Sequence, residues 1–240
     1  MTLSVTVLGC DGSYAGAGGA CSGYLVQGAG LNLWVDAGPG TLANLQRHVT
    51  LSEVDAVVLS HEHPDHWHDL EGLAVACYHA LGRTGVPVYA PPALRSLVYH
   101  YTHEVFSWTE VADGDVVDLG GVVASFSRTD HGPVTLAVRF DSAGRSVGYS
   151  ADSGPGWSLE ALGPDLDLAI CEATYTKQDE GRLRHMSARQ AGTSACEARV
   201  DHLVLTHKWT TVDPEAVMAE GSEAFGQWVD LAEVNARYRV

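Results

Sequence analysis

The sequence predicts an α/β fold, an αββα sandwich in which two mixed β-sheets stack between outer layers of helices. Three observations predict it. Short apolar segments alternate with turn residues and helical patterns in the first half of the chain, strands with a hairpin signal fill the middle, and no linker, repeat or low-complexity tract divides the sequence. Because each sheet must bury an apolar face, two stacked sheets flanked by helices fit this order best.

The elements follow from the same patterns in chain order. Short apolar runs bounded by turn residues predict strands at residues 5–8, 24–26, 31–35, 57–59 and 88–90. Helical spacing predicts helices at 41–48, 69–80 and 93–101 between them, and later at 187–199 and 214–225. The middle strands, at 116–119, 122–127, 135–140 and 146–149, are expected to be antiparallel, with a hairpin turn at 141–144. Residues 168–171 and 203–206 are the last two predicted strands.

Composition limits the classes of function. A length of 240 residues favours a single domain over residues 1–240 with one sizeable core. No apolar run approaches the roughly 20 residues of a membrane span, so no membrane partner is expected. The first residues lack a secretory signal, which favours the cytoplasm, and the five scattered cysteines favour reduced, buried thiols. A formal charge of −16 would repel a nucleic acid duplex.

The run His61-Glu62-His63-Pro64-Asp65-His66 is the strongest functional signal. It places three imidazoles and a carboxylate within six positions. His61 and His63 leave the end of an apolar run, while Asp65 and His66 follow a proline turn that can aim them at a second point. Imidazole and carboxylate suit zinc, and manganese or iron is also compatible with them. The loop therefore predicts a site for two divalent ions.

Further candidates follow other predicted strands: His131, Asp152 and His207. The motif H-x-H-x-D-H, followed by a lone His, Asp and His at strand ends, resembles the metallo-β-lactamase superfamily over nearly the whole chain. The glycine-rich turn at 8–13 and the segment at 35–38 belong to the same resemblance. It implies that His61, His63 and His131 hold one ion, that Asp65, His66 and His207 hold the other, that Asp152 bridges them, and that Asp36 orients the metal loop.

Such a centre predicts hydrolysis. Two ions lower the pKa of bound water toward about 7 and neutralise charge on a phosphoryl or acyl oxygen. Asp65 would orient the attacking hydroxide as well as bind metal.

The segment at 182–192 narrows the reaction. Its His185-Met186-Ser187 run resembles the His-Met-Ser/Thr motif of ribonuclease Z and related phosphodiesterases. Ser187 with Gln190 forms a capping box, which predicts a helix start able to bind an anion and makes Ser187 a substrate-binding candidate. His185 would donate a proton to the leaving alkoxide or contact a phosphate oxygen. Glu172 resembles the acidic partner that keeps this histidine protonated.

The size of the substrate is predicted from what the chain lacks. Ribonuclease Z proper carries a long arm between the equivalents of His131 and Asp152, whereas here 20 residues, enough for one hairpin, separate them. Without that exosite arm, a small-molecule phosphodiester such as a cyclic nucleotide is the expected substrate. Three tryptophans close to presumed ligands, Trp67, Trp157 and Trp209, are candidates for stacking a base, although packing explains such positions equally well.

Other functions stay open at this stage. A lactone, thioester or lactam hydrolase would use the same metal centre, and a ribonuclease Z-like RNA-processing enzyme or a non-catalytic binder of metal or nucleotide would share much of the sequence pattern. A homodimer is an expectation at the level of the family.

Overall fold

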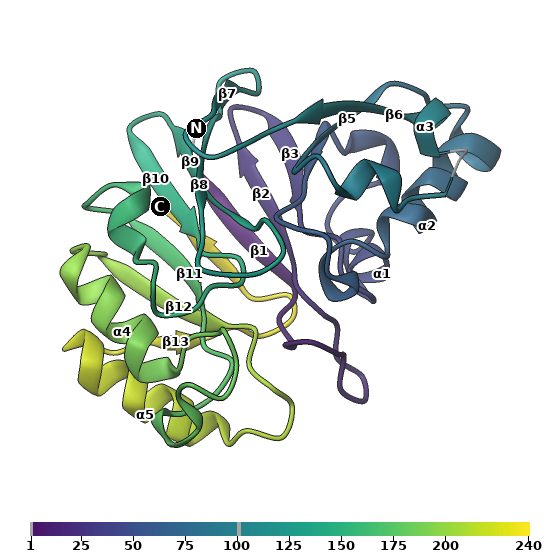
Figure 1. Ribbon diagram of the computed structural model, residues 1–240. Helices are drawn as coiled ribbons and strands as arrows, with labels where there is room; N and C mark the ends of the chain where they lie inside the picture. The colour runs from purple at the N-terminus through teal and green to yellow at the C-terminus, as the bar shows by residue number, and fades with distance from the viewer. Residues whose placement is uncertain (1, 100–101) are drawn as a thin grey trace.

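Two seven-stranded sheets form the centre of the protein (Figure 1). The computed structural model describes residues 2–99 and 102–240. In spatial order, the first sheet contains β14 (Arg237–Arg239), β1 (Ser4–Gly9), β2 (Gly23–Gly28), β3 (Leu31–Val35), β4 (Ala56–Val58), β5 (Val86–Ala90) and β6 (Phe106–Glu110). The second contains β13 (Asp230–Leu231), β12 (His202–Thr206), β11 (Leu168–Glu172), β10 (Arg145–Tyr149), β9 (Leu136–Ser142), β8 (Val123–Arg128) and β7 (Val116–Asp118).

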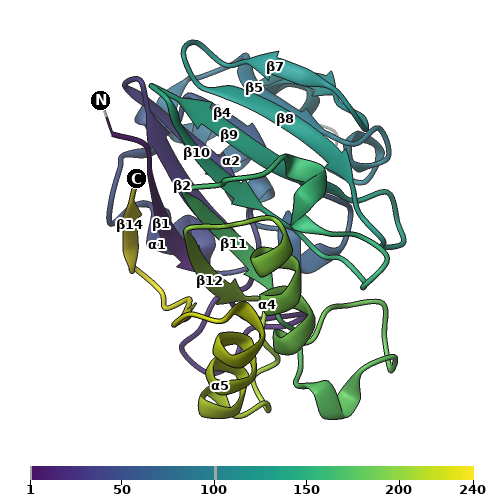
Figure 2. The same ribbon diagram turned by 90° about the vertical axis from the view of Figure 1, so that its left-hand side faces the viewer.

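Helices cover the outer side of each sheet. α1 (Thr41–Leu45), α2 (Leu70–Ala76) and α3 (Thr102–Val105) lie against the first sheet, and α4 (Ala188–Glu197) and α5 (Pro214–Phe225) lie against the second, as Figure 1 shows. The two ends of the chain meet in the first sheet, where β14 pairs antiparallel with β1 (Figure 2). The αββα sandwich predicted from the sequence is confirmed.

Both sheets are mixed, and in the same way. β1, β2 and β3 are antiparallel, whereas β3 to β6 run parallel. In the second sheet β7 to β10 are antiparallel and β10 to β13 parallel. Hairpins supply the antiparallel half of each sheet, and helical or longer crossovers supply the parallel half.

Alternating side chains divide the core into three parts. Val5, Val7 and Leu33 point between the sheets and belong to the inter-sheet core. Their neighbours Leu25 and Trp34 point the other way and pack beneath α1 and α2. A third cluster fills the space beneath α4 and α5. Because both faces of each sheet are buried, the central strands are apolar over most of their length.

The strand directions bring the candidate ligands together. β3 and β4 are parallel, and β8, β10 and β12 share one direction within the second sheet. The chain leaves the carboxyl ends of these strands directly before Asp36, His61, His131, Asp152 and His207. All five side chains therefore gather at one edge of the sandwich, the usual place for a site in an α/β sheet.

Some element predictions are wrong in detail. The helix expected at 41–48 ends at Leu45, and the one at 93–101 is a single 3-10 turn, Leu94–Ser96, followed by residues 100 and 101, which lie outside the described part. Leu94 and Val98 are the buried apolar residues in the described part of this segment and Leu97 is 51% exposed, so the buried face is too small to stabilise a longer helix. The strands β6, β13 and β14 were not predicted, and β13 and β14 are two and three residues long.

Candidate metal centre

The loop after β4 holds the H-x-H-x-D-H motif in a tight turn. Pro64 begins a 3-10 turn, Pro64–His66, since its fixed φ suits a first helical position. The turn lies directly on the segment after β3, where a Cβ at Gly38 would come within 2.1 Å of the carbonyl oxygen of Asp65. Only glycine permits this approach. His61, Asp65 and His66 are consequently buried rather than mobile at the surface.

A first group of ligand atoms converges near His63. The His63 Nδ1 lies 3.1 Å from the His61 Nε2 and 3.2 Å from the His131 Nε2. The Oδ2 of Asp152 lies 3.5 Å from the His61 Nε2 and 3.8 Å from the His131 Nε2. Three ring nitrogens and one carboxylate oxygen therefore surround a common point.

A second group converges beside the first. The His207 Nε2 is 3.3 Å from Asp65 Oδ2 and 3.4 Å from Asp152 Oδ1. The His66 Nε2 is 3.5 Å from Asp65 Oδ2 and 3.2 Å from Asp152 Oδ1. Asp152 thus turns one carboxylate oxygen toward each group, which is the position of a bridging ligand.

Asp36 fixes the orientation of this loop. Its Oδ2 accepts hydrogen bonds from His66 Nδ1 at 2.7 Å, from the Tyr149 hydroxyl at 2.7 Å and from the Ser60 hydroxyl at 2.8 Å, and its Oδ1 accepts from the Ser60 backbone N–H at 2.8 Å. Because His66 Nδ1 carries the donated proton, its Nε2 faces the second group bare. Hydrogen bonds of this kind set the tautomer of a metal-binding histidine.

The other histidines are oriented by the same logic. The Ser60 hydroxyl donates to Asp36, so it must accept from His61 Nδ1, 3.0 Å away. His131 Nδ1 lies 3.0 Å from the carbonyl oxygen of Arg184, which can only accept. Both imidazoles therefore carry their proton on Nδ1 and present a bare Nε2 to the first group.

The Thr174 hydroxyl determines which ring nitrogen of His207 carries the proton. It donates to Glu172 Oε2 at 2.7 Å and so accepts from His207 Nδ1 at 3.0 Å. Tyr149, Ser60 and Thr174 are residues that the sequence analysis missed. Ser60 and Thr174 are hydroxyl residues that stand two positions after the end of a strand. This pattern is too common in sequences to identify either residue as part of the site.

The electrostatics of the site suit cations. Burial raises the pKa of Asp152, but the imidazoles of His207 and His66 outweigh it and hold that pKa well below its usual range. Burial lowers the pKa of His61 well below its usual range, which keeps the ring neutral. An anionic carboxylate, as at Asp152, and a neutral imidazole, as at His61, are the forms that bind metal.

A pair of metal ions fits the residues present. His66 Nε2 and Asp152 Oδ1 are buried and have no hydrogen-bond partner among the described residues. Unpaired buried polar atoms are costly, and a cation in each group would satisfy both. The groups of described residues with metal-binding geometry contain histidine and aspartate without cysteine. The His/Asp cluster therefore fits a dinuclear metal site.

His185 and Glu172 lie beside the cluster as a pair. His185 Nδ1 is 2.9 Å from Glu172 Oε1, and the imidazole packs on the rings of His131 and His207 at centroid distances of 5.0 and 5.4 Å. Burial lowers the pKa of His185, but the Glu172 carboxylate outweighs it and raises the pKa to about 9. Glu172 Oε1 also accepts the backbone N–H of Ser153 at 2.6 Å, which fixes the carboxylate in place.

The predicted substrate contacts are placed differently. Ser187 is buried, and its hydroxyl accepts from the Gln190 backbone N–H at 3.1 Å while donating to Glu180 at 2.6 Å. The capping box is confirmed, but a hydroxyl committed on both sides does not support a substrate contact. Trp67 and Trp157 are buried in the clusters beneath α2 and α4, and Trp157 also lines a small hollow of about 150 Å³.

Of the three candidate tryptophans, Trp209 is the one near the surface. It is partly exposed, two residues after His207, and its indole N–H donates to the Ser13 hydroxyl at 3.2 Å. The glycine-rich segment reaches the site here, because a Cβ at Gly12 would lie 2.1 Å from the His207 carbonyl oxygen. This segment therefore forms one wall of the metal centre.

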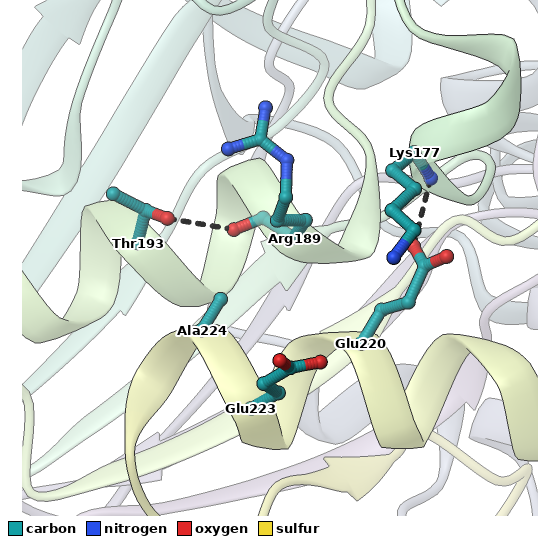
Figure 3. Close-up of a pocket in the computed structure, with 6 residues that line it drawn as sticks. All are labelled: Lys177, Arg189, Thr193, Glu220, Glu223 and Ala224. Carbon is teal, nitrogen blue, oxygen red and sulfur yellow. Dashed lines mark hydrogen bonds between the residues drawn. The ribbon is translucent and has the colours of Figure 1, made fainter.

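A separate hollow lies on the outer face of α4 and α5 (Figure 3). It has a volume of about 320 Å³ and is lined by Lys177, Arg189, Thr193, Glu220, Glu223 and Ala224. The backbone N–H of Lys177 donates to Glu220 at 2.7 Å, as the dashed line in Figure 3 marks. The Arg189 guanidinium is held by Glu180 through bonds of 2.9 and 2.7 Å. The charge of Arg189 is thus paired with Glu180, and the hollow is distinct from the metal centre.

Within residues 2–99 and 102–240, no helix combines the length and the apolar character that a membrane crossing requires.

Comparison with known proteins identifies the relatives of this chain. Residues 31–208 match the family model described as Beta-lactamase superfamily domain. The chain is 33% identical over 211 residues to the probable metallo-hydrolase YhfI of Bacillus subtilis, an alignment covering 85% of this chain and 86% of that protein. It is 29% identical to a ribonuclease Z of Methanopyrus kandleri, covering 93% of both. The crystal structure of B. subtilis YhfI, a metallo-β-lactamase fold protein, superposes with a TM-score of 0.92 at 28% identity, covering 100% of both chains.

Proposed function

The chain belongs to the metallo-β-lactamase superfamily, a superfamily of metallo-hydrolases, and from this premise we propose that it is a phosphodiesterase acting on a small phosphodiester such as a cyclic nucleotide. The observation that carries the proposal is the His185–Glu172 pair beside the cluster. A buried histidine paired with a carboxylate next to a metal centre is suited to protonate an alkoxide leaving group.

We propose that one ion is held by His61, His63 and His131, the other by Asp65, His66 and His207, and that Asp152 binds both. Zinc is the first choice of metal, and manganese or iron is compatible with the same donors. When bound, such ions supply an activated water and neutralise charge on the phosphoryl oxygens. The carboxylate of Asp65 lies at the edge of the second group, where it can orient that water as well as bind metal.

His185 completes the reaction. As the oxygen of water bonds to phosphorus, the bond from phosphorus to the leaving oxygen breaks and that oxygen needs a proton. His185 donates its Nε2 proton to it, while Glu172 holds Nδ1–H and stabilises the cationic ring. Glu172 acts through His185 and is a positioning residue.

A small substrate is proposed because of the segment between His131 and Asp152. It forms only the hairpin of β9 and β10, which is buried in the second sheet and extends no arm. The net charge of −16 is also unfavourable for a long RNA. Ribonuclease Z proteins are among the relatives, so transfer RNA cleavage is an outcome that the experiment must separate.

The test is hydrolysis of 3′,5′-cyclic AMP by protein loaded with zinc or manganese, with products resolved by chromatography. We expect metal-dependent formation of 5′-AMP, lost after chelation and regained on adding metal back. A metal-loaded protein that leaves cyclic AMP and other small phosphodiesters intact, but opens a lactone or thioester or cleaves precursor transfer RNA, would refute the proposal.

The role of His185 has a sharper test. In His185→Ala, turnover of cyclic AMP should fall on the order of 10²-fold or more, since the sugar alkoxide needs a proton. Hydrolysis of a 4-nitrophenyl phosphodiester, whose leaving group needs none, should fall far less. His48→Ala, which changes an exposed histidine that follows α1 and hydrogen-bonds the side chain of Asn235, is the matched control. Equal losses on both substrates would contradict the general-acid role.

A further inference from the structure

A second hollow is lined in part by Trp209, two residues after the candidate ligand His207. It has a volume of about 540 Å³, within the range of sites that hold small molecules. Its wall combines aromatic, cationic and carboxylate side chains: Tyr14, Gln178, Asp179, Arg182, Trp209 and Asp213. Tyr14, from the glycine-rich segment, lines the hollow and is 53% exposed. This mixture of flat surfaces and hydrogen-bonding groups is suited to a planar polar ligand.

The walls of this hollow are attached to the metal centre on two sides. The indole of Trp209 donates to the Ser13 hydroxyl, and the Ser13 backbone N–H lies 3.4 Å from His207 Nε2. Behind Trp209, Tyr175 packs edge-on at a centroid distance of 6.1 Å, and its hydroxyl donates to the His185 carbonyl oxygen at 2.8 Å. The wall of the hollow is therefore tied by hydrogen bonds to residues of the metal centre.

Arg182 and Trp209 form a stacked pair. The guanidinium carbon lies 5.4 Å from the centroid of the indole ring. Arg182 also lies 3.5 Å from Asp179, so its guanidinium is placed by both the carboxylate and the indole ring. Indole rings and guanidinium planes are the surfaces on which proteins stack unpaired bases.

The charges in the wall favour a base over a second phosphate. Asp179 and Asp213 both face the hollow, whereas Arg182 is the cation in the same lining. Carboxylates repel another phosphate, but they accept hydrogen bonds from the amino group of a base. A neutral ring with an N–H donor satisfies the wall, whereas an anion does not.

We propose that the hollow between Tyr14, Arg182 and Trp209 is a nucleobase subsite, in which an amino-bearing base stacks on the Arg182–Trp209 pair while its phosphodiester lies at the metal cluster. This inference rests on the proposed phosphodiesterase function. It makes the enzyme selective for nucleotide diesters over diesters that lack a base.

Two substrates with the same leaving group test the subsite. The 4-nitrophenyl ester of adenosine 5′-monophosphate and methyl 4-nitrophenyl phosphate differ in the nucleoside alone. Trp209→Ala should lower kcat/KM for the adenosine ester on the order of 10-fold or more, mainly through KM, and change the methyl ester less than about 2-fold. Trp209→Phe should keep most of the selectivity, because it keeps a ring.

Trp228→Ala is the matched control, since that tryptophan is 72% exposed and lies beyond the opposite end of α5. It should leave both substrates unchanged. Equal losses on the two esters in Trp209→Ala, or no loss on either, would overturn the subsite.

Binding separates failure of the subsite from failure of the proposed function. By calorimetry on the metal-loaded protein, adenosine 5′-monophosphate should bind at least about 10-fold more tightly than ribose 5-phosphate, and Trp209→Ala should abolish that difference. Because neither ligand has to be hydrolysed, this measurement does not depend on phosphodiesterase activity. A protein that cleaves neither ester but retains this preference refutes the phosphodiesterase and supports the subsite, whereas equal affinities in the wild type overturn the subsite alone.

Discussion

Replacing Thr174 with valine removes a single hydroxyl from the centre of the site. The side chain is buried after the end of β11, where its hydroxyl donates to Glu172 at 2.7 Å and accepts from His207 Nδ1 at 3.0 Å. Valine has the same branched shape, so the packing is kept while both hydrogen bonds are lost. The change therefore isolates the hydrogen bonds behind one metal-binding histidine.

Two effects are expected from Thr174→Val. The His207 Nδ1–H is left buried without its acceptor, which costs about 1–3 kcal/mol of stability. For a chain of this size that corresponds to a fall in Tm of roughly 2–12 °C. Loss of the group that orients a ligand typically lowers metal affinity about 10–100-fold. Because Thr174 contacts His207, the affinity should fall at the group formed by Asp65, His66 and His207.

The assay is a zinc titration of metal-free protein against a chromophoric chelator. Wild type should bind two ions, and Thr174→Val should keep one affinity near the wild-type value while the other weakens about 10–100-fold. Thr174→Ser retains the hydroxyl and should restore two-site binding. Two unchanged affinities in the valine variant, or a serine variant as impaired as the valine variant, would refute this account of His207.

Three other substitutions or conditions have defined outcomes. Asp36→Asn replaces one of two carboxylate oxygens that together accept four hydrogen bonds, so metal affinity in the same titration should fall about 10–100-fold. An unchanged affinity would show that His66 is oriented without the Asp36 carboxylate. Ser187→Ala should lower stability by about 1 kcal/mol, or roughly 2–4 °C in Tm, with kcat/KM on a 4-nitrophenyl diester within about 2-fold; a large rise in KM would return this hydroxyl to the substrate site. Adding zinc at about 100 times Kd to metal-free protein should stabilise it by about 2.7 kcal/mol per ion, which a scanning fluorimetry Tm measures; an unmoved Tm would argue against binding to the folded state.

The sequence predicts which side chains gather at the candidate metal centre because most of them carry a local signal. His61 to His66 stand within one motif, and His131, Asp152 and His207 each directly follow a strand. Parallel strands deliver their following residues to the same sheet edge, so position along the chain is enough to place the side chains together.

The hydrogen bonds behind the ligands are not predictable in this way. The Tyr149 hydroxyl donates to Asp36 across the space between the two sheets. The two residues are 113 positions apart in the sequence. Which strand of one sheet faces which strand of the other is a property of the packed fold, and no local pattern encodes it. The role of Tyr149 therefore becomes visible only in three dimensions.

The tryptophans show the same limit. Trp67 and Trp209 both follow a predicted ligand closely, yet the first is buried beneath α2 and the second lines a hollow. Trp67 precedes a helix whose inner face packs on the first sheet, which draws the ring inward. Trp209 precedes a loop that joins β12 to α5 at the surface, and the sequence alone does not distinguish these two surroundings.

Glu172 links the proton donor to both groups of ligands. One carboxylate oxygen holds His185 and the backbone N–H of Ser153, the residue after the bridging Asp152; the other accepts the Thr174 hydroxyl that orients His207. The position of the proton donor and the orientation of two ligand-bearing segments thus depend on one buried side chain. Contacts that share a partner do not contribute independently, so the effects of changing Glu172, Thr174 and His185 should be strongly non-additive. The candidate metal centre and the proposed general acid are in this sense one hydrogen-bonded unit, with Glu172 buried at its centre.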